Sequence, residues 1–114
     1  MRLLFVGASV VGTLMLCQSA AADINHVLTY GVGNSSCGQW LELRKSHSEY
    51  VMSSWLSGYV TGASAYNSGK MAATDTDGLV ADADQFCRAH PLDPFLDAAA
   101  IVVLHLQQAG RSHP

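Results

Sequence analysis

The sequence predicts an all-α protein in which four short helices pack around one core and are held by a single disulfide. Three observations support this fold class. Four segments carry apolar residues at the three- and four-residue spacing of amphipathic helices. Residues that stop and start helices separate the last two segments, in "HPLDP" at positions 90–94. Cys37 and Cys87 lie in the first and third segments, where one bridge would connect them.

Residues 1–22 have the features of a secretory signal peptide. A basic start precedes an apolar run over residues 3–16, and the small-residue motif "SAAA" ends at Ala22. The run is shorter than the ~20 residues that span a bilayer, which favours a cleaved leader over a retained anchor. Cys17 lacks the preceding small residue that lipidation requires and would leave with the leader. We therefore expect a periplasmic or secreted protein, cleaved near Ala22.

Cys37 and Cys87 are the cysteines that remain after this cleavage. An even count in an exported chain favours a disulfide. Closing the 50 positions between them would contribute ~4 kcal/mol on the loop-entropy model. A catalytic thiol would have to stay reduced outside the cytoplasm, and metal binding would need a CxxC or HxxxH spacing, which the sequence lacks. The pair is therefore predicted to be structural, with His90 as a capping or surface residue.

The segment before the first helix, residues 23–35, is predicted to be an irregular arm. It has no helical period, and Gly31, Gly33 and Asn34 are turn formers. A short extended piece is expected over residues 27–30. The "GVG" motif lacks the strand–helix context of a phosphate-binding loop.

The first helix is expected from Cys37 to about Lys45, with Ser36 as its N-cap. Trp40, Leu41 and Leu43 would turn inward. The polar residues that follow, through position 48, would end it.

The second helix is expected from about Glu49 to Tyr66. One predicted packing face consists of Trp55, Tyr59, Ala63 and Tyr66. A second stripe consists of the small residues Ser54, Gly58 and Gly62. Two glycines cost a helix roughly 1–2 kcal/mol, so close approach of another helix of the domain is the expected compensation. A helix-dimer face in a bilayer is the alternative for this stripe. The motif "NSG" would end the helix.

The third helix is expected over Gly78 to Ala89, with Thr76 or Asp77 as its N-cap. The residues predicted to be buried are Leu79, Val80, Ala83, Phe86 and Cys87. The preceding "TDTDG" resembles the start of a calcium loop, but apolar residues occupy the later ligand positions.

The fourth helix is expected from Pro94 to Gln108, capped by Asp93 and closed by Gly110. Its apolar residues are Phe95, Leu96, Ala99, Val102, Val103 and Leu106. The helical domain would thus span residues 36–110, followed by a tail of residues 111–114.

No residue pattern predicts catalysis, a cofactor or a metal site. The histidines have no paired spacing, and no nucleophile–base arrangement is evident. His105, on the fourth helix between Leu104 and Leu106, is expected to be a residue at the boundary between core and solvent rather than a ligand. The acidic cluster of Asp75, Asp77, Asp82 and Asp84 is expected to form a solvated face. An enzyme is therefore the least favoured class.

The charge balance excludes a nucleic-acid partner and indicates sensitivity to acid. Six Lys and Arg stand against nine Asp and Glu, a net charge of −3, and loss of Arg2 with the leader makes it −4. Protonation of nine carboxylates and five histidines would move the mature chain to about +10 in strong acid. Repulsion of that size loosens a small domain, while a disulfide keeps it compact.

Three motifs, "SCGQWLEL", "WLSGY" and "FCRAHP", resemble the small periplasmic acid-stress chaperones of the HdeA/HdeB type. The matching positions are Cys37, Trp40, Leu41, Trp55, Cys87 and Pro91. The resemblance implies an acid-activated holdase, dimeric at neutral pH, that covers exposed apolar segments of other proteins. The tail "QQAGRSHP" departs from the lysine-rich ends of that family.

A second resemblance is to the Tai-type immunity proteins of type VI secretion, through "SGYVTGASA" and the "FC" and "HP" pairs. It implies a non-catalytic protein that binds and blocks one partner toxin. Both resemblances imply a protein partner, and the sequence does not identify that partner.

Overall fold

The computed structural model describes residues 28–112. They form a 3₁₀ helix (Gly31–Asn34) and four α-helices, α1 (Cys37–Lys45), α2 (Tyr50–Tyr66), α3 (Thr76–Ala89) and α4 (Phe95–Ser112). Within this range no β-strand occurs, and an isolated bridge joins Ser36 to Pro94. The predicted all-α class is confirmed. The expected signal peptide and the arm as far as residue 27 lie outside the described residues.

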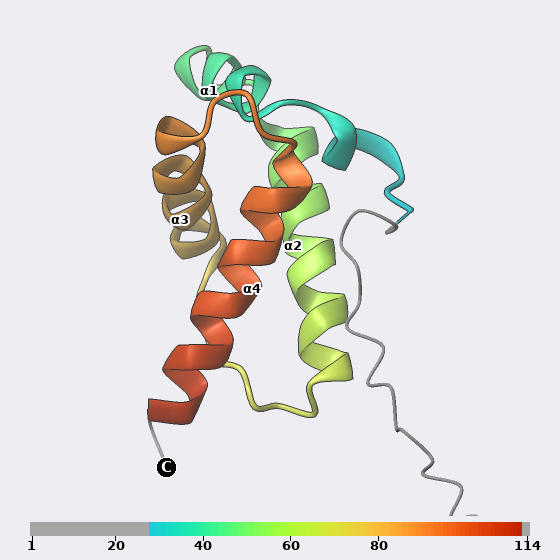
Figure 1. The fold of residues 1–114 in the computed structure, drawn as a ribbon, viewed down its shortest axis with the longest axis vertical. Helices are drawn as coiled ribbons and strands as arrows, with labels where there is room; N and C mark the ends of the chain where they lie inside the picture. The colour runs from blue at the N-terminus through green and yellow to red at the C-terminus, as the bar shows by residue number, and fades with distance from the viewer. Residues whose placement is uncertain (1–27, 113–114) are drawn as a thin grey trace, which may run out of the picture.

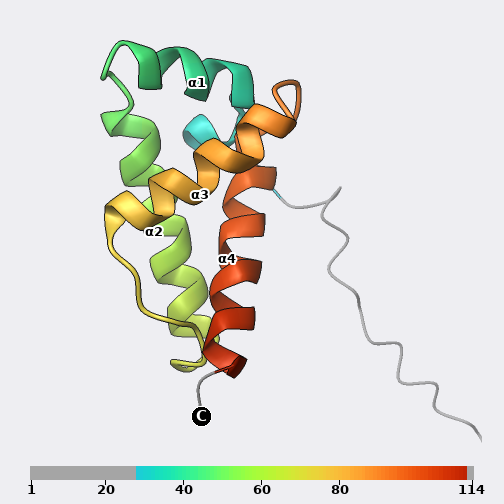
Figure 2. The same ribbon diagram turned by 90° about the vertical axis from the view of Figure 1, so that its left-hand side faces the viewer.

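The four helices pack around one core. α2 and α4 run side by side along the long direction of the domain, and α1 lies across their N-terminal ends (Figure 1). α3 packs obliquely on α4 and reaches α1 (Figure 2). The first and third helices therefore meet at one end of the domain, although some 30 residues of chain separate them.

Aromatic side chains fill the core at this end. Trp40 and Phe95 are both fully buried and stack with ring centroids 4.8 Å apart. Trp55 also packs against Phe95, in a tilted arrangement with ring centroids 5.9 Å apart. Burying such a side chain contributes roughly 2–3 kcal/mol, so these contacts give a small domain much of its stability.

The start of α1 is held by the segment that precedes α4. The N–H of Cys37 donates to the carbonyl of Asp93, and the N–H of Gly38 donates to that of Pro91, both at 2.8 Å. The predicted N-cap, Ser36, accepts from the N–H of Gln39 at 3.1 Å. These bonds satisfy the N–H groups that a helix leaves unpaired at its first turn.

The boundaries of α3 and α4 differ from those predicted. α3 begins at Thr76 because Asp75, rather than Thr76 or Asp77, caps it by accepting from Gly78 at 2.8 Å. α4 begins at Phe95 and continues through Gly110 to Ser112, so residues 111 and 112 are helical rather than part of a tail. Gly110 does not close the helix. A Cβ there would overlap the carbonyl of Lys70, so the glycine allows the α2–α3 loop to lie against α4.

The packing predicted for α2 is partly wrong. Its buried residues are Met52, Leu56 and Val60, which lie on a helical face next to the predicted one. Trp55 and Tyr59 flank this face and are half-buried, whereas Tyr66 is 91% exposed. Gly58 and Gly62 are exposed, and an added Cβ would meet nothing within 4 Å at either position. The expected close approach of a second helix along this stripe is therefore absent from residues 28–112.

Part of the predicted irregular arm is ordered. Residues 31–34 form the 3₁₀ helix, and the Trp55 indole Nε1 donates to the carbonyl of Tyr30 at 3.0 Å. Gly33 is buried here, and it packs so closely on Trp55 that a Cβ at this position would overlap the indole ring. The glycine predicted as a turn former thus serves close packing on α2.

Candidate functional site

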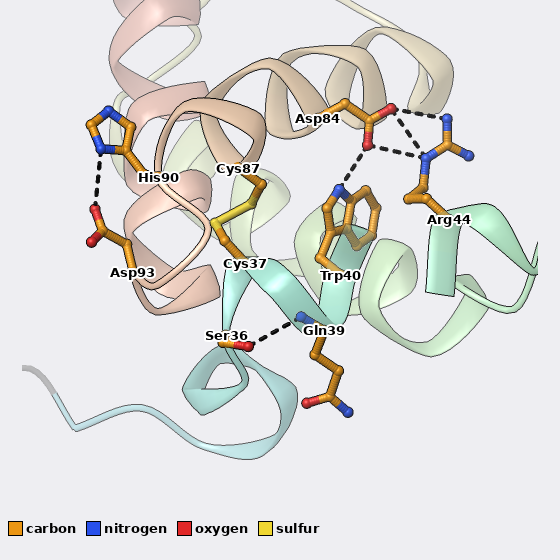
Figure 3. The surroundings of a disulfide bond; sticks show 9 residues. All are labelled: Ser36, Cys37, Gln39, Trp40, Arg44, Asp84, Cys87, His90 and Asp93. Carbon is orange, nitrogen blue, oxygen red and sulfur yellow. Dashed lines mark hydrogen bonds and ion pairs between the residues drawn. A yellow bond between two sulfur atoms is a disulfide. The ribbon is translucent and has the colours of Figure 1, made fainter. Parts of the chain in front are cut away.

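The predicted disulfide joins α1 to α3. Cys37, the first residue of α1, bonds to Cys87 in α3, with Cα atoms 4.8 Å apart, and both residues are fully buried (Figure 3). The bridge confirms the predicted pairing. A buried cystine offers no thiolate, so neither sulfur can serve as a nucleophile in this state.

A polar contact joins the same two helices near the disulfide. Asp84 is 8% exposed, and its Oδ1 accepts from the indole Nε1 of Trp40 at 2.7 Å. Arg44 donates to both oxygens of the same carboxylate, from Nε at 3.1 Å and from Nη2 at 3.0 Å. Asp84 in α3 therefore accepts a neutral and a bidentate charged donor from α1, and the charge-assisted bonds are the stronger kind.

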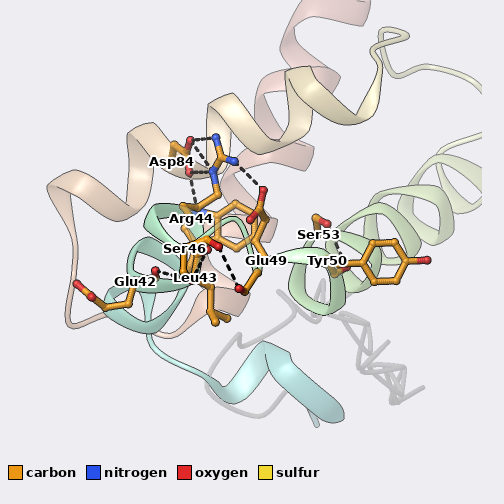
Figure 4. A network of polar contacts seen from close by, with 10 residues as sticks. Glu42, Leu43, Arg44, Ser46, Glu49, Tyr50, Ser53 and Asp84 are labelled. Atoms are coloured by element: carbon orange, nitrogen blue, oxygen red, sulfur yellow. Dashed lines mark hydrogen bonds and ion pairs between the residues drawn. The ribbon is translucent and has the colours of Figure 1, made fainter.

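Glu49, just before α2, extends this contact. Its Oε1 accepts from Arg44 Nη1 at 2.8 Å, so the guanidinium lies between two carboxylates (Figure 4). The bond from its own backbone N–H and the bond from Arg44 hold the pKa of Glu49 below its usual value. The carboxylates in turn raise the pKa of Arg44, chiefly through the hydrogen bond to Asp84. We call Trp40, Arg44, Glu49 and Asp84 the α1–α3 network.

The network and the disulfide differ in chemical sensitivity. In the network two carboxylates bind the Arg44 guanidinium, and ion pairs of this kind require the ionised form of the acid. The disulfide is indifferent to acid and is broken by reduction.

The prediction of a solvated acidic face is wrong for Asp84. Asp75 and Asp77 are exposed as predicted, and Asp82 is half-buried. Asp75 caps α3, and Asp82 lies 2.9 Å from Nδ1 of His105, whose side chain is half exposed. Asp84 is buried. The sequence carries a signal for this, because Asp84 shares the i, i+3, i+4, i+7 face of Val80, Ala83 and Cys87.

His90 and Phe86 lie at the end of α3. His90 is the exposed C-cap residue, which confirms its predicted place between two helices. Its ring stacks on Phe86 at 4.5 Å, and its Nδ1 lies 3.6 Å from Asp93. Phe86, which was predicted to be buried, is only half-buried against the core. Among residues 28–112, no group of three His, Cys, Asp or Glu side chains is placed to hold a metal ion.

An apolar hollow of about 220 Å³ is lined by α2, α4 and the segment that precedes the 3₁₀ helix. Trp55 and Tyr59, stacked at 5.4 Å, form its wall with Leu96. Leu28 and Tyr30, 79% and 78% exposed, form its rim. Burial raises the pKa of Tyr59 above its usual value, consistent with this apolar setting. Contiguous exposed apolar side chains of this kind are typical of protein-binding surfaces.

Comparison with known proteins finds no match to this chain among family models, curated proteins or solved structures. The two resemblances therefore rest on the sequence motifs alone. In the described part of the chain, no helix is both long and apolar enough to cross a membrane.

Proposed function

We propose that this chain is an exported, non-catalytic, HdeA-like protein that binds exposed apolar segments of other proteins under acid stress. The observation that carries the proposal is the α1–α3 network. Its carboxylates fasten α1 over the aromatic core at neutral pH, and protonation removes their charge.

Two effects act together when the pH falls. Arg44 loses its ionised partners Asp84 and Glu49, and the mature chain, at −4 near neutrality, becomes strongly positive. Self-repulsion then opposes the compact state. Cys37 remains bonded to Cys87, so the first turn of α1 stays attached while the rest can separate. Such an opening would expose Trp40 and Phe95, which provide apolar surface for a client.

Light scattering from an aggregating client tests this proposal. The oxidised protein of residues 23–114 is mixed with a client that aggregates in acid and another that aggregates at neutral pH. We expect suppression at pH 2 and none at pH 7, and loss of suppression after reduction of the disulfide. Absence of suppression at pH 2, with helices retained by circular dichroism at pH 7, would reject the proposal.

A second function, specific blocking of one partner, is supported by the apolar hollow. Its rim residues Leu28 and Tyr30 are already exposed at neutral pH, so this surface needs no acid to become available. A partner toxin would insert an aliphatic or aromatic side chain there. Titration of a candidate toxin at pH 7 with wild type and with a Leu28→Asp/Tyr30→Asp variant tests it. Equal affinity for both proteins would exclude the hollow as the binding surface.

A further inference from the structure

A second depression, distinct from the apolar hollow, lies between α1 and α3. It encloses about 530 Å³ and has cationic and apolar side chains along its walls. The cations are Arg44, Lys45 and Arg88, and the apolar residues include Leu41 and Pro91. We propose that this groove binds an acidic segment of another protein, with carboxylates next to an aliphatic side chain.

The charge of the groove is opposite to that of the chain. Three of the five Lys and Arg side chains in the described residues line it, against two carboxylates, Glu42 and Asp84, which leaves +1 with His47 neutral. The whole chain carries −3, so everything outside the groove sums to −4. A negatively charged segment is therefore attracted to this face and repelled by the remainder, which fixes where it docks.

Two of the three cations are available to a ligand. Within residues 28–112, Arg88 is exposed and has no ion pair or side-chain hydrogen bond. Lys45 pairs with Glu42 three residues away, but both side chains are more than 70% exposed, and such a pair contributes little. A bound carboxylate can replace Glu42 at Lys45 and bind Arg88 through two parallel bonds.

The third cation holds the groove in shape. Arg44 is bound to Asp84 and Glu49, so it positions α1 beside α3 and needs no new partner. Half-buried Leu41, one turn before Lys45, and exposed Pro91 give the groove an apolar part. An aliphatic side chain of the segment would contact these two residues while flanking carboxylates contact Lys45 and Arg88. Carboxylates next to an apolar residue, rather than a bare anion, fit this lining.

This inference is independent of acid-dependent client binding. The partner's carboxylates must be ionised, so binding belongs to neutral pH and weakens in acid, where the proposed holdase acts. Failure of one proposal leaves the other intact.

Fluorescence anisotropy with a labelled peptide tests the groove. The probe is a peptide of about ten residues with alternating Glu and Leu, measured at pH 7 and low salt. The test variant is Lys45→Glu/Arg88→Glu. The matched control is Lys70→Glu/Arg111→Glu, which makes the same charge change elsewhere; Arg111, like Arg88, lies in the last turn of its helix.

We expect the test variant to bind the peptide about tenfold or more weakly and the control to stay within about twofold of wild type, because local charge pairs rather than net charge supply the affinity. A peptide with Gln in place of every Glu should bind at least about tenfold more weakly to wild type.

The proposal is overturned by equal losses of affinity in the two variants, by equal binding of the Gln and Glu peptides, or by no binding of the Glu peptide. Binding of anionic phosphatidylglycerol vesicles without binding of the peptide would instead assign the groove to a membrane surface. Circular dichroism at pH 7 verifies that each variant is folded.

Discussion

The carboxylate of Asp84 in α3 lies 2.7 Å from the indole nitrogen of Trp40 in α1, one helical turn from the Cys37–Cys87 bridge. Two independent connections thus join the same pair of helices, one polar and one covalent. The polar connection also binds Arg44, which links it to the start of α2 through Glu49. The behaviour of the domain in acid depends on how much each connection contributes to keeping α1 packed on the core.

Replacing Asp84 with Ala should lower the free energy of unfolding by about 2–3 kcal/mol. The change leaves the buried Trp40 indole N–H and part of the Arg44 guanidinium without acceptors, and the one-third exposure of Arg44 keeps the loss below that of a fully buried pair. Urea unfolding at pH 7 measures it. Asp82→Ala, which removes a carboxylate from the same helix but only an exposed contact with His105, should cost less than about 1 kcal/mol. Equal losses would show that the contacts of Asp84 add nothing.

Removing the disulfide should be more costly. A Cys37→Ser/Cys87→Ser variant loses a bridge that closes 50 residues, worth about 4 kcal/mol on the loop-entropy model. Chemical unfolding of the variant and of reduced wild type should give the same large decrease in midpoint. An unchanged midpoint in both would contradict the structural role of the bridge.

Gly58→Ala and Gly62→Ala should each stabilise the protein at pH 7, by about 0.5–1 kcal/mol. Alanine is the better helix former, and the added methyl group meets no neighbour at either position. Thermal unfolding of the two variants measures the gain. Destabilisation by either one would mean that another helix, from this chain or a second copy, packs on the stripe after all.

The α1–α3 network predicts a specific pH dependence. The pKa of Glu49 is lowered in the folded protein, so its contribution is complete above the unfolded value of 4.5 and is lost as pH falls through the folded pKa. Stability should therefore decrease with falling pH below about 4.5, and less steeply in Glu49→Gln. Urea unfolding between pH 7 and pH 3 measures both slopes, with Glu42→Gln as a control for loss of one charge from α1. Equal flattening in both variants would assign the effect to net charge.

Local sequence patterns predicted most of the fold. The end of α3 before His90 and the cap at Ser36 depend on neighbours close in sequence, and both are confirmed. The disulfide, which joins residues 50 positions apart, was predicted from the even cysteine count and is also confirmed. The predicted roles of Gly58 and Gly110 are wrong because the role of a glycine depends on the atoms that face it in the folded chain. Gly58 faces open space, whereas Gly110 faces the carbonyl of Lys70.

The candidate site was harder to predict than the fold. The position of Asp84 on the apolar face of α3 is visible in the helical period, but its partners come from α1, 40 and 44 residues earlier. A buried carboxylate is stable there only because Arg44 and Trp40 both reach it. Periodicity indicates which residues face inward, whereas pairing of polar groups between helices depends on how the helices cross.

The two tryptophan indoles can show whether acid releases the α1–α3 network before the rest of the domain. Trp40 Nε1–H donates to a carboxylate, whereas Trp55 Nε1–H donates to the backbone carbonyl of Tyr30, which does not titrate. We would follow both indole protons by NMR from pH 7 to pH 2 in the oxidised protein, with exchange rates referenced to free tryptophan. We predict that the Trp40 proton shifts and loses protection first, while the Trp55 proton remains protected over the same range. Simultaneous loss of both, or retention of both at pH 2, would contradict the account.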